Sequence, residues 1–297
     1  MTFFKFIILF STFIIFDTNA VLNKPKYGKK TQALKDTTPV QSKFLMPNSK
    51  EELFTLGKFS DSQKFKVTDP INIIVWNIYN GVKPKWKETY ETFIKDRDLI
   101  LLQEFNLKDE MKKVFNSDPN LGYTCATAFI EAEGHVLTGV ATASKVKPIN
   151  TYVLRGLSRE PIVDSSKVTL FSEFKVEGLK EKLLVVNVHA ITFVRSKYLF
   201  DQLDGIANVF MFHKGPLIVA GDFNTWKLTH IKYLDKIIKK NNLIEVTFEK
   251  DLRIHTFNEK LDHIFVRGFD IEKSETLLSF AGSDHNAMTA ILKFKKE

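Results

Sequence analysis

The stretch LIVAGDFNTW, from Leu217 to Trp226, decides the class of fold. It opens with an unbroken apolar run, which is typical of a strand that is covered on both faces. Gly221 ends the run, and Asp222 and Asn224 follow. Residues two apart in extended backbone project to the same side, so the pattern predicts a carboxylate and an amide together at the rim of a sheet. A simple turn is the alternative, because Gly, Asp and Asn are common turn formers.

Short apolar runs alternate with polar helical segments from Ile71 onward, which predicts one mixed α/β (α+β) domain over residues 71–297. Strands are predicted over residues 71–76, 98–104, 136–145, 167–176, 182–190, 217–224, 260–268 and 286–294. Helices are predicted over residues 86–95, 195–213 and 230–240.

Polar side chains recur at the tips of these strands. They are Asn77, Glu104, Asn187, His189, Asp222, Asn224, Asp262, Asp284 and His285. One polar tip is a turn, but repeated tips in one domain indicate a shared pocket. Carboxylates are hard oxygen ligands that suit Mg²⁺, and histidines beside acids transfer protons near neutral pH. The pattern therefore predicts one polar pocket whose residues can bind a metal and transfer protons.

The N-terminal segment predicts export. One lysine precedes an apolar run from Phe6 to Phe16, and small residues at Thr18 and Ala20 fit a cleavage site. The run is short for a bilayer span, which needs about 20 residues. We therefore expect a signal peptide over residues 1–20 and a secreted or periplasmic mature protein. An uncleaved N-terminal anchor is the alternative.

The basic charge is concentrated near the N-terminus. The chain has a formal net charge of +8, and residues 21–70 contain ten lysines and five acids. Residues 21 to about 50 are interpreted as a Lys-rich flexible arm, and the remainder to residue 70 as the lead-in to the domain. The arm either binds nucleic acid or another anionic surface or serves as a solvated linker. Cys125 is the one cysteine, so an intrachain disulfide and a cysteine-rich zinc site are excluded.

Several segments resemble the motif set of the DNase I-like endonuclease/exonuclease/phosphatase superfamily. They are VWNIYNG with Asn77, LLQE with Glu104, NVHAITF with His189, GDFNTW with Asp222 and Asn224, LDHIFVRG with Asp262, and SDHNAM with Asp284 and His285. Their order and spacing match from about Ile71 to Phe294. Together with SREP at Arg159, they are similar to a bacterial branch of that superfamily.

The resemblance implies a four-layered sandwich with two central mixed β-sheets between helices. It also implies phosphoester hydrolysis that depends on Mg²⁺, with Mn²⁺ or Ca²⁺ as alternatives. By this resemblance Glu104 ligates the metal, with Asn77 and Asp284 near it. His285 is implied as the general base or as the group that stabilises the phosphorane, and Asp262 holds it in place.

The resemblance assigns the remaining polar residues to water and phosphate. Asp222 and Asn224 would orient the attacking water and the phosphate, where Asn77 would also contribute. His189 would donate to a phosphate or leaving-group oxygen, and Arg159 would face a phosphate backbone. The carboxylate that pairs with His189 is left open among Glu131, Glu133 and Glu160.

The substrate class does not follow from the resemblance. The basic charge, the arm and Arg159 favour a nuclease that cleaves DNA or RNA, with nucleic acid as its substrate. A phospholipid or sugar phosphodiesterase or phosphatase is the alternative. A binding protein on an inactive scaffold is disfavoured by the complete polar set. We expect a monomer with no stable membrane insertion after signal cleavage.

Overall fold

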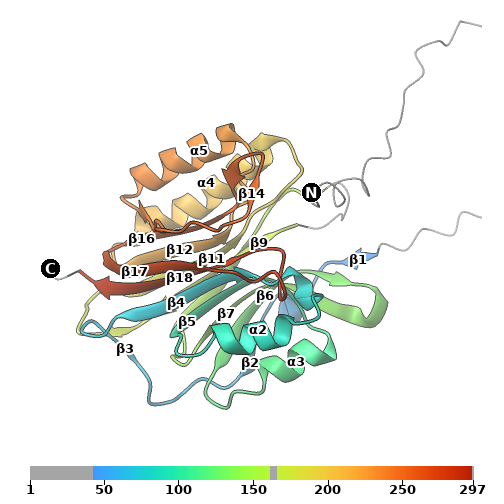
Figure 1. Ribbon diagram of the computed structural model, residues 1–297, viewed down its shortest axis with the longest axis horizontal. Coiled ribbons are helices and arrows are strands. Elements are labelled where there is room, and N and C mark those ends of the chain that lie inside the picture. The colour runs from blue at the N-terminus through green and yellow to red at the C-terminus, as the bar shows by residue number, and fades with distance from the viewer. Residues whose placement is uncertain (1–42, 161–165, 296–297) are drawn as a thin grey trace, which may run out of the picture. The chain divides into compact units, whose positions relative to one another are not determined.

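Two mixed β-sheets lie face to face at the centre of the computed structural model, which describes residues 43–160 and 166–295 (Figure 1). The first sheet has the order β1 (Phe44–Leu45), β6 (Gly122–Glu131), β7 (Val136–Ser144), β5 (Leu99–Asn106), β4 (Ile71–Asn77), β18 (Ala287–Phe294) and β17 (Phe269–Leu277), and β2 (Leu53–Gly57) also pairs with β6. The second has the order β13 (Ile244–Glu245), β16 (Asp262–Arg267), β12 (Leu217–Asp222), β11 (Leu183–His189), β9 (Val168–Phe174) and β8 (Asn150–Arg155).

Helices cover the outer face of each sheet, as Figure 1 shows. The first sheet packs on α2 (Trp86–Phe93) and α3 (Asp109–Phe115), and the second on α4 (Ser196–Phe212) and α5 (Leu228–Lys240). Between the sheets lies a separate apolar core, to which β4, β5 and β18 contribute from one side and β11, β12 and β16 from the other. The predicted four-layered sandwich is therefore confirmed.

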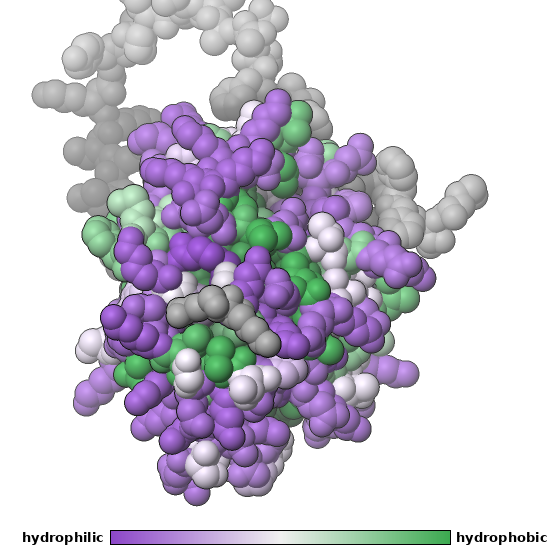
Figure 2. Space-filling model, turned by 90° about the vertical axis from the view of Figure 1, so that its left-hand side faces the viewer, coloured by the Kyte–Doolittle hydropathy of each residue, from purple (hydrophilic) through white to green (hydrophobic). Residues whose placement is uncertain are grey.

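Short elements complete the described chain. They are α1 (Ser49–Glu52), β3 (Phe65–Lys66), η2 (Tyr79–Gly81), η3 (Glu133–His135), β10 (Val176–Glu177), β14 (His255–Thr256) and β15 (Glu259–Lys260). Among the described helices, none has the length and apolar character needed to cross a bilayer. Figure 2 views the side of the molecule at which β18 ends, and its surface is largely hydrophilic.

The strand register brings distant polar residues to one edge. β11 and β12 run parallel and place His189 opposite Asp222. β16 runs antiparallel to β12 and places Asp262 opposite the same aspartate. In the first sheet, β4 and β5 run parallel and place Asn77 opposite Gln103. The strands that carry these residues end at the same edge, so their polar side chains lie close together there.

The predicted strands and helices are present, but the predicted arm extends too far. Residues 44–50 were included in it, whereas β1 pairs with β6 and Ser49 begins α1. The folded unit starts close to residue 42. The signal peptide and most of the arm lie outside the described residues.

Some elements were missed because their sequences lack a clear apolar pattern. β17 is an edge strand with the sequence FDIEKSETL, and most of its side chains are partly or fully exposed. Such a strand is held by pairing with β18, a contact that its own composition does not encode.

Candidate active site

Three buried polar residues form a row across the edge of the second sheet. His189 ends β11, Asp222 ends β12 and Asp262 begins β16, and each of the three is buried. Nε2 of His189 lies 3.8 Å from Oδ2 of Asp222. Strand pairing fixes their backbones, so their spacing is set by the sheet rather than by a flexible loop.

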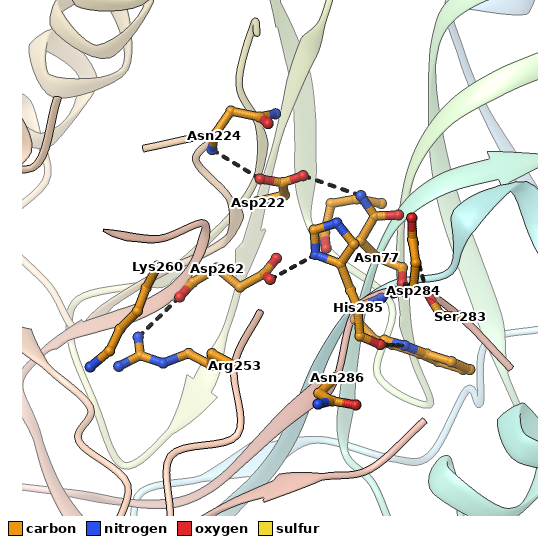
Figure 3. Close-up of polar contacts among 12 residues, drawn as sticks. Asn77, Asp222, Asn224, Arg253, Lys260, Asp262, Ser283, Asp284, His285 and Asn286 are labelled. Carbon is orange, nitrogen blue, oxygen red and sulfur yellow. Dashed lines mark hydrogen bonds and ion pairs between the residues drawn. The ribbon is translucent and has the colours of Figure 1, made fainter. Parts of the chain in front are cut away.

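His285 and Asp262 form the closest pair of titratable groups in the site, as Figure 3 shows. Nδ1 of His285 lies 2.7 Å from Oδ2 of Asp262. A carboxylate only accepts, so Nδ1 carries the hydrogen and Nε2 is left to face the pocket. The backbone of His285 is also fixed, because Nε1 of Trp76 donates to its carbonyl at 3.0 Å and its own N–H donates to Oγ of Ser283 at 3.1 Å.

Asn77 connects the two sheets within the site. Its Nδ2 donates to Oε1 of Glu104 at 3.0 Å and to Oδ2 of Asp222 at 3.2 Å. The second oxygen of Glu104 accepts from Nδ2 of Asn80 at 3.2 Å. Nε2 of His189 lies 3.7 Å from Oε1 of Glu104. The carboxylate of Glu104 is thus oriented by two amides while it stays partly open to solvent.

Glu104 occupies an unusual backbone position. It is the extra residue of a β-bulge, because Gln103 pairs with Val140 and Phe105 with Gly139. Its φ is 57°, in the left-handed region that L-residues with side chains rarely adopt. A bulge turns a side chain away from the regular alternation of its strand, and here it aims Glu104 at the site. Tyr79, Asn80 and Asn224 share this left-handed conformation, so strained backbone is concentrated here.

Asn224 differs from its predicted arrangement. β12 ends at Asp222, and Asn224 has a φ of 50° instead of continuing the strand. Oδ1 of Asp222 accepts from the N–H of Asn224 at 2.9 Å, which is an Asx turn. Nδ2 of Asn224 donates to the carbonyl of Ala190 at 2.8 Å. The expectation that both side chains leave an extended backbone side by side was therefore wrong, because Asp222 itself closes the turn.

The environment shifts the two site histidines in opposite directions. Burial, helped by the nearby charge of Lys167, holds the pKa of His189 well below its ordinary value. Burial alone would also lower the pKa of His285, but the carboxylates of Asp262, Asp222 and Asp284 outweigh it and hold that pKa well above the ordinary value. Opposed shifts of this kind separate a neutral imidazole from a protonated one.

Asp222 has the most perturbed carboxyl group of the site. Burial, followed by repulsion from Asp262, raises its pKa to about 7. Asp284 as a whole residue is exposed to solvent, but its carboxyl group is partly desolvated. This desolvation, together with repulsion from Glu104, raises the pKa of Asp284 as well. A cluster of acids that repel one another is relieved by a cation.

The donor atoms form two compact groups that fit a divalent cation. One comprises Glu104, His189 and Asp222, and the other Asp222, Asp262 and His285, with the ligand atoms of each group within 4.8 Å of one another. Asp284 lies outside both groups, although it lies close enough to Glu104 to raise the pKa described above. Hard oxygen donors dominate the first group, as Mg²⁺ prefers.

Arg159 and Glu160 follow β8 in the chain. Arg159 is exposed and precedes the buried Glu160 in the loop between β8 and β9. Glu160 accepts from the N–H of Thr192 at 3.1 Å and lies 3.6 Å from Nζ of Lys167. Among the described residues, the carboxylates close to His189 are therefore Glu104 and Asp222, rather than the acids left open by the sequence.

A cavity of about 200 Å³ opens beside Glu104 and His189. Asn80 and Lys167 also line it. The sequence marks no role for Asn80 and leaves Lys167 open between a solvated strand face and a phosphate contact. Asn80 lies in a short 3₁₀ turn after β4, and Lys167 lies directly before β9. The cavity thus lies directly beside the carboxylate of Glu104 and the imidazole of His189.

A buried charge network supports the site from behind and was also missed. Arg253 donates to the backbone carbonyl of Asp262 at 3.0 Å, as Figure 3 shows. It also pairs with Glu245 and Asp251. Glu245 also accepts from Nδ1 of His263 at 2.9 Å. His263 is therefore part of this network. Arg253 lies in a loop without a motif, so no local signal marked it.

Comparisons with known proteins agree with this geometry. Residues 74–285 match the Endonuclease/Exonuclease/phosphatase family. The chain belongs to that family. A UPF0294 protein of Vibrio campbellii is 34% identical over 233 residues, which cover 78% of this chain and 80% of that protein.

Solved structures of the endonuclease/exonuclease/phosphatase family share the fold. A family protein from Leptotrichia buccalis has a TM-score of 0.60 at 17% identity and covers 75% of this chain and 100% of its own. A mannosyl-6-phosphatase from Bacteroides thetaiotaomicron has a TM-score of 0.55 at 16% identity, with coverage of 75% and 100%. These similarities show the fold alone, whereas family membership makes the protein a phosphoester hydrolase of a family that generally uses divalent metal.

Proposed function

We propose that this protein is a secreted or periplasmic nuclease that uses a divalent metal to hydrolyse phosphodiester bonds of DNA or RNA. The observation that carries the proposal is the close pair of Asp262 and His285, which forms one compact donor group with Asp222. The basic net charge of +8 and the exposed Arg159 support a polyanionic substrate.

Glu104 is the residue proposed to hold the metal, supported by Asn77 and Asp284. Its carboxylate is oriented by the amides of Asn77 and Asn80, which leaves it preorganised for a cation. When bound, Mg²⁺ would supply charge that stabilises the phosphoryl oxygens in the transition state.

The remaining residues divide the proton chemistry. Asp222, with a pKa raised to about 7, is suited to accept the proton of an attacking water near neutral pH. His285 keeps a proton on Nδ1 through Asp262, and its Nε2–H donates to the phosphoryl oxygens as negative charge develops. His189 is held neutral by burial and contributes a hydrogen bond to a phosphate or leaving-group oxygen. A phosphate contact by Asn224 remains a prediction.

A second candidate function is hydrolysis of a lipid or sugar phosphoester. The mannosyl-6-phosphatase with the same fold motivates it. Purified protein would be assayed with plasmid DNA, single-stranded RNA, sphingomyelin vesicles, mannose 6-phosphate and methyl p-nitrophenyl phosphate. Cleavage of nucleic acid well above the other natural substrates is expected, and preference for a lipid or a sugar phosphate would replace the proposed substrate.

The metal requirement is tested with Glu104→Gln, which keeps the shape but removes the charge. We expect turnover to fall at least about a hundredfold, because the carboxylate charge is the main attraction for a hard cation. Glu272→Gln is the matched control, since Glu272 is an exposed acid on the edge strand β17. Full activity of the wild type in EDTA would contradict the metal-dependent mechanism.

A further inference from the structure

Three aromatic side chains form a continuous cluster on the surface. The ring centroids of Phe193 and Trp226 lie 6.1 Å apart, and those of Trp226 and Phe257 lie 5.9 Å apart. Phe193 is 70% exposed and Phe257 is 79% exposed, while Trp226 is partly buried between them. Large apolar side chains seldom gather in solvent unless they contact a ligand or partner.

The cluster lies at the same edge as the catalytic residues. Phe193 follows the end of β11, and Trp226 is two residues beyond Asn224. Phe257 is at the tip of the hairpin formed by β14 and β15, just before β16 begins, and Figure 1 shows β14 beside α4 and α5. Oγ1 of Thr225 donates to the carbonyl of Lys260 at 2.6 Å, which ties this hairpin to the GDFNTW segment.

The backbone holds both exposed rings outward at a cost. Phe193 has a φ of 54°, a left-handed conformation in a bulky residue. Phe257, with a φ of 52°, and Asn258, with a φ of 66°, are the two central residues of the hairpin turn, which presents the Phe257 ring at its tip. Such positions are energetically unfavourable and are concentrated at functional sites. Neither ring gains compensating burial, so packing of the folded chain does not explain their placement.

Cations border the rings. Nζ of Lys227 lies 4.2 Å from the centroid of the Trp226 ring, and Arg195 is exposed two residues after Phe193. Neither cation forms an ion pair with any residue in the described part of the chain. Aromatic faces interleaved with unpaired cations match the alternation of bases and phosphates in a nucleic-acid strand.

We propose that Phe193, Trp226 and Phe257 form a stacking platform for unpaired nucleobases next to the phosphate that is cleaved. Lys227 and Arg195 contact the flanking phosphates. The platform rests on the proposed nuclease function and refines it. A ring stacks on a base only when the face of that base is free, so the enzyme prefers single-stranded nucleic acid or locally unpaired strands.

The test measures binding separately from turnover. Phe193→Ala and Phe257→Ala are made in the wild type and in a His285→Ala background that does not cleave. The Kd is measured for a labelled single-stranded oligonucleotide, for the same backbone with abasic sites, and for the duplex. Each substitution should raise the Kd for the single strand about tenfold and leave that for the abasic strand unchanged.

Phe212→Ala is the matched control, because Phe212 is 82% exposed at the far end of α4 from the site. It should change no Kd. Equal effects of the ring substitutions on the intact and abasic strands, or no effect at all, would overturn the platform. Loss of binding to phospholipid vesicles with oligonucleotide binding intact would also overturn it and assign the rings to lipid.

The platform and the proposed function fail in different ways. If the wild type cleaves oligonucleotides but the ring variants behave like the wild type, the nuclease proposal stands and the platform does not. If the wild type hydrolyses only methyl p-nitrophenyl phosphate or a lipid, and binds intact and abasic strands equally, both the nuclease assignment and the platform are wrong.

Discussion

Replacing Asp262 with asparagine removes a negative charge 2.7 Å from Nδ1 of His285 with little change in volume. The aspartate is buried and His285 has only 12% of its side chain exposed, so solvent replaces little of the lost interaction. Breaking a buried ion pair costs about 3–5 kcal/mol. If that cost falls on the transition state, turnover drops roughly 10²- to 10⁴-fold.

The assay compares turnover for the wild type, Asp262→Asn, His285→Ala and the double variant on one oligonucleotide at saturating metal. We expect His285→Ala to be nearly inactive and Asp262→Asn to be severely but less impaired. The double variant should be no worse than His285→Ala, because the carboxylate acts through the imidazole. Arg253 still holds the backbone carbonyl of residue 262, so the melting temperature should change little in Asp262→Asn.

Additive losses would refute this reasoning. If the double variant turns over far more slowly than His285→Ala, the carboxylate of Asp262 has a function that does not pass through the imidazole. Binding a metal directly would be such a function, since Asp262, Asp222 and His285 also form one of the two compact donor groups.

Three further predictions concern the arm and the stability of the fold. Deleting residues 21–41, a deletion that stops short of β1, should weaken binding to long DNA and reduce the salt dependence of that binding. Turnover on methyl p-nitrophenyl phosphate should not change. Unchanged affinity for DNA would make the arm a linker. Gly221→Ala should destabilise the fold by at least about 2 kcal/mol in chemical denaturation, because φ is +139° and a Cβ would lie 2.0 Å from the carbonyl oxygen of Val188; an unchanged midpoint would contradict this. Although burial opposes ionisation of Glu245, His263 and Arg253 lower its pKa to about 2. The ionised Glu245 therefore stabilises the fold above its ordinary pKa of 4.5, and this stabilisation is lost as the pH falls toward 2. Glu245→Gln should therefore show a smaller fall in melting temperature than the wild type over that range, and parallel curves would exclude this linkage.

The apolar runs determined the strands that build the centre of the fold. Three of these strands consist almost entirely of β-branched or aliphatic residues, namely LIVAGD, LLVVNVH and INIIVWN. Such a composition is typical of a strand that is buried on both faces of its sheet. The polar residues that end these runs identified the candidate site, including the Asp262–His285 pair. Family membership agrees with that interpretation. Local sequence was sufficient here because the signals are periodicity and the type of residue at a strand end.

Only the tertiary structure decided how the polar groups are aimed. The left-handed bulge at Glu104 arises from its register against β7, and the Asx turn at Asp222 replaced the extended backbone expected there. Arg253 became part of the site through a contact with the carbonyl of Asp262. The rings of Phe193 and Phe257 are far apart in the sequence and are joined through Trp226. Each of these features depends on which strands and loops lie next to one another, and that depends on pairing between distant segments rather than on the composition of any one segment.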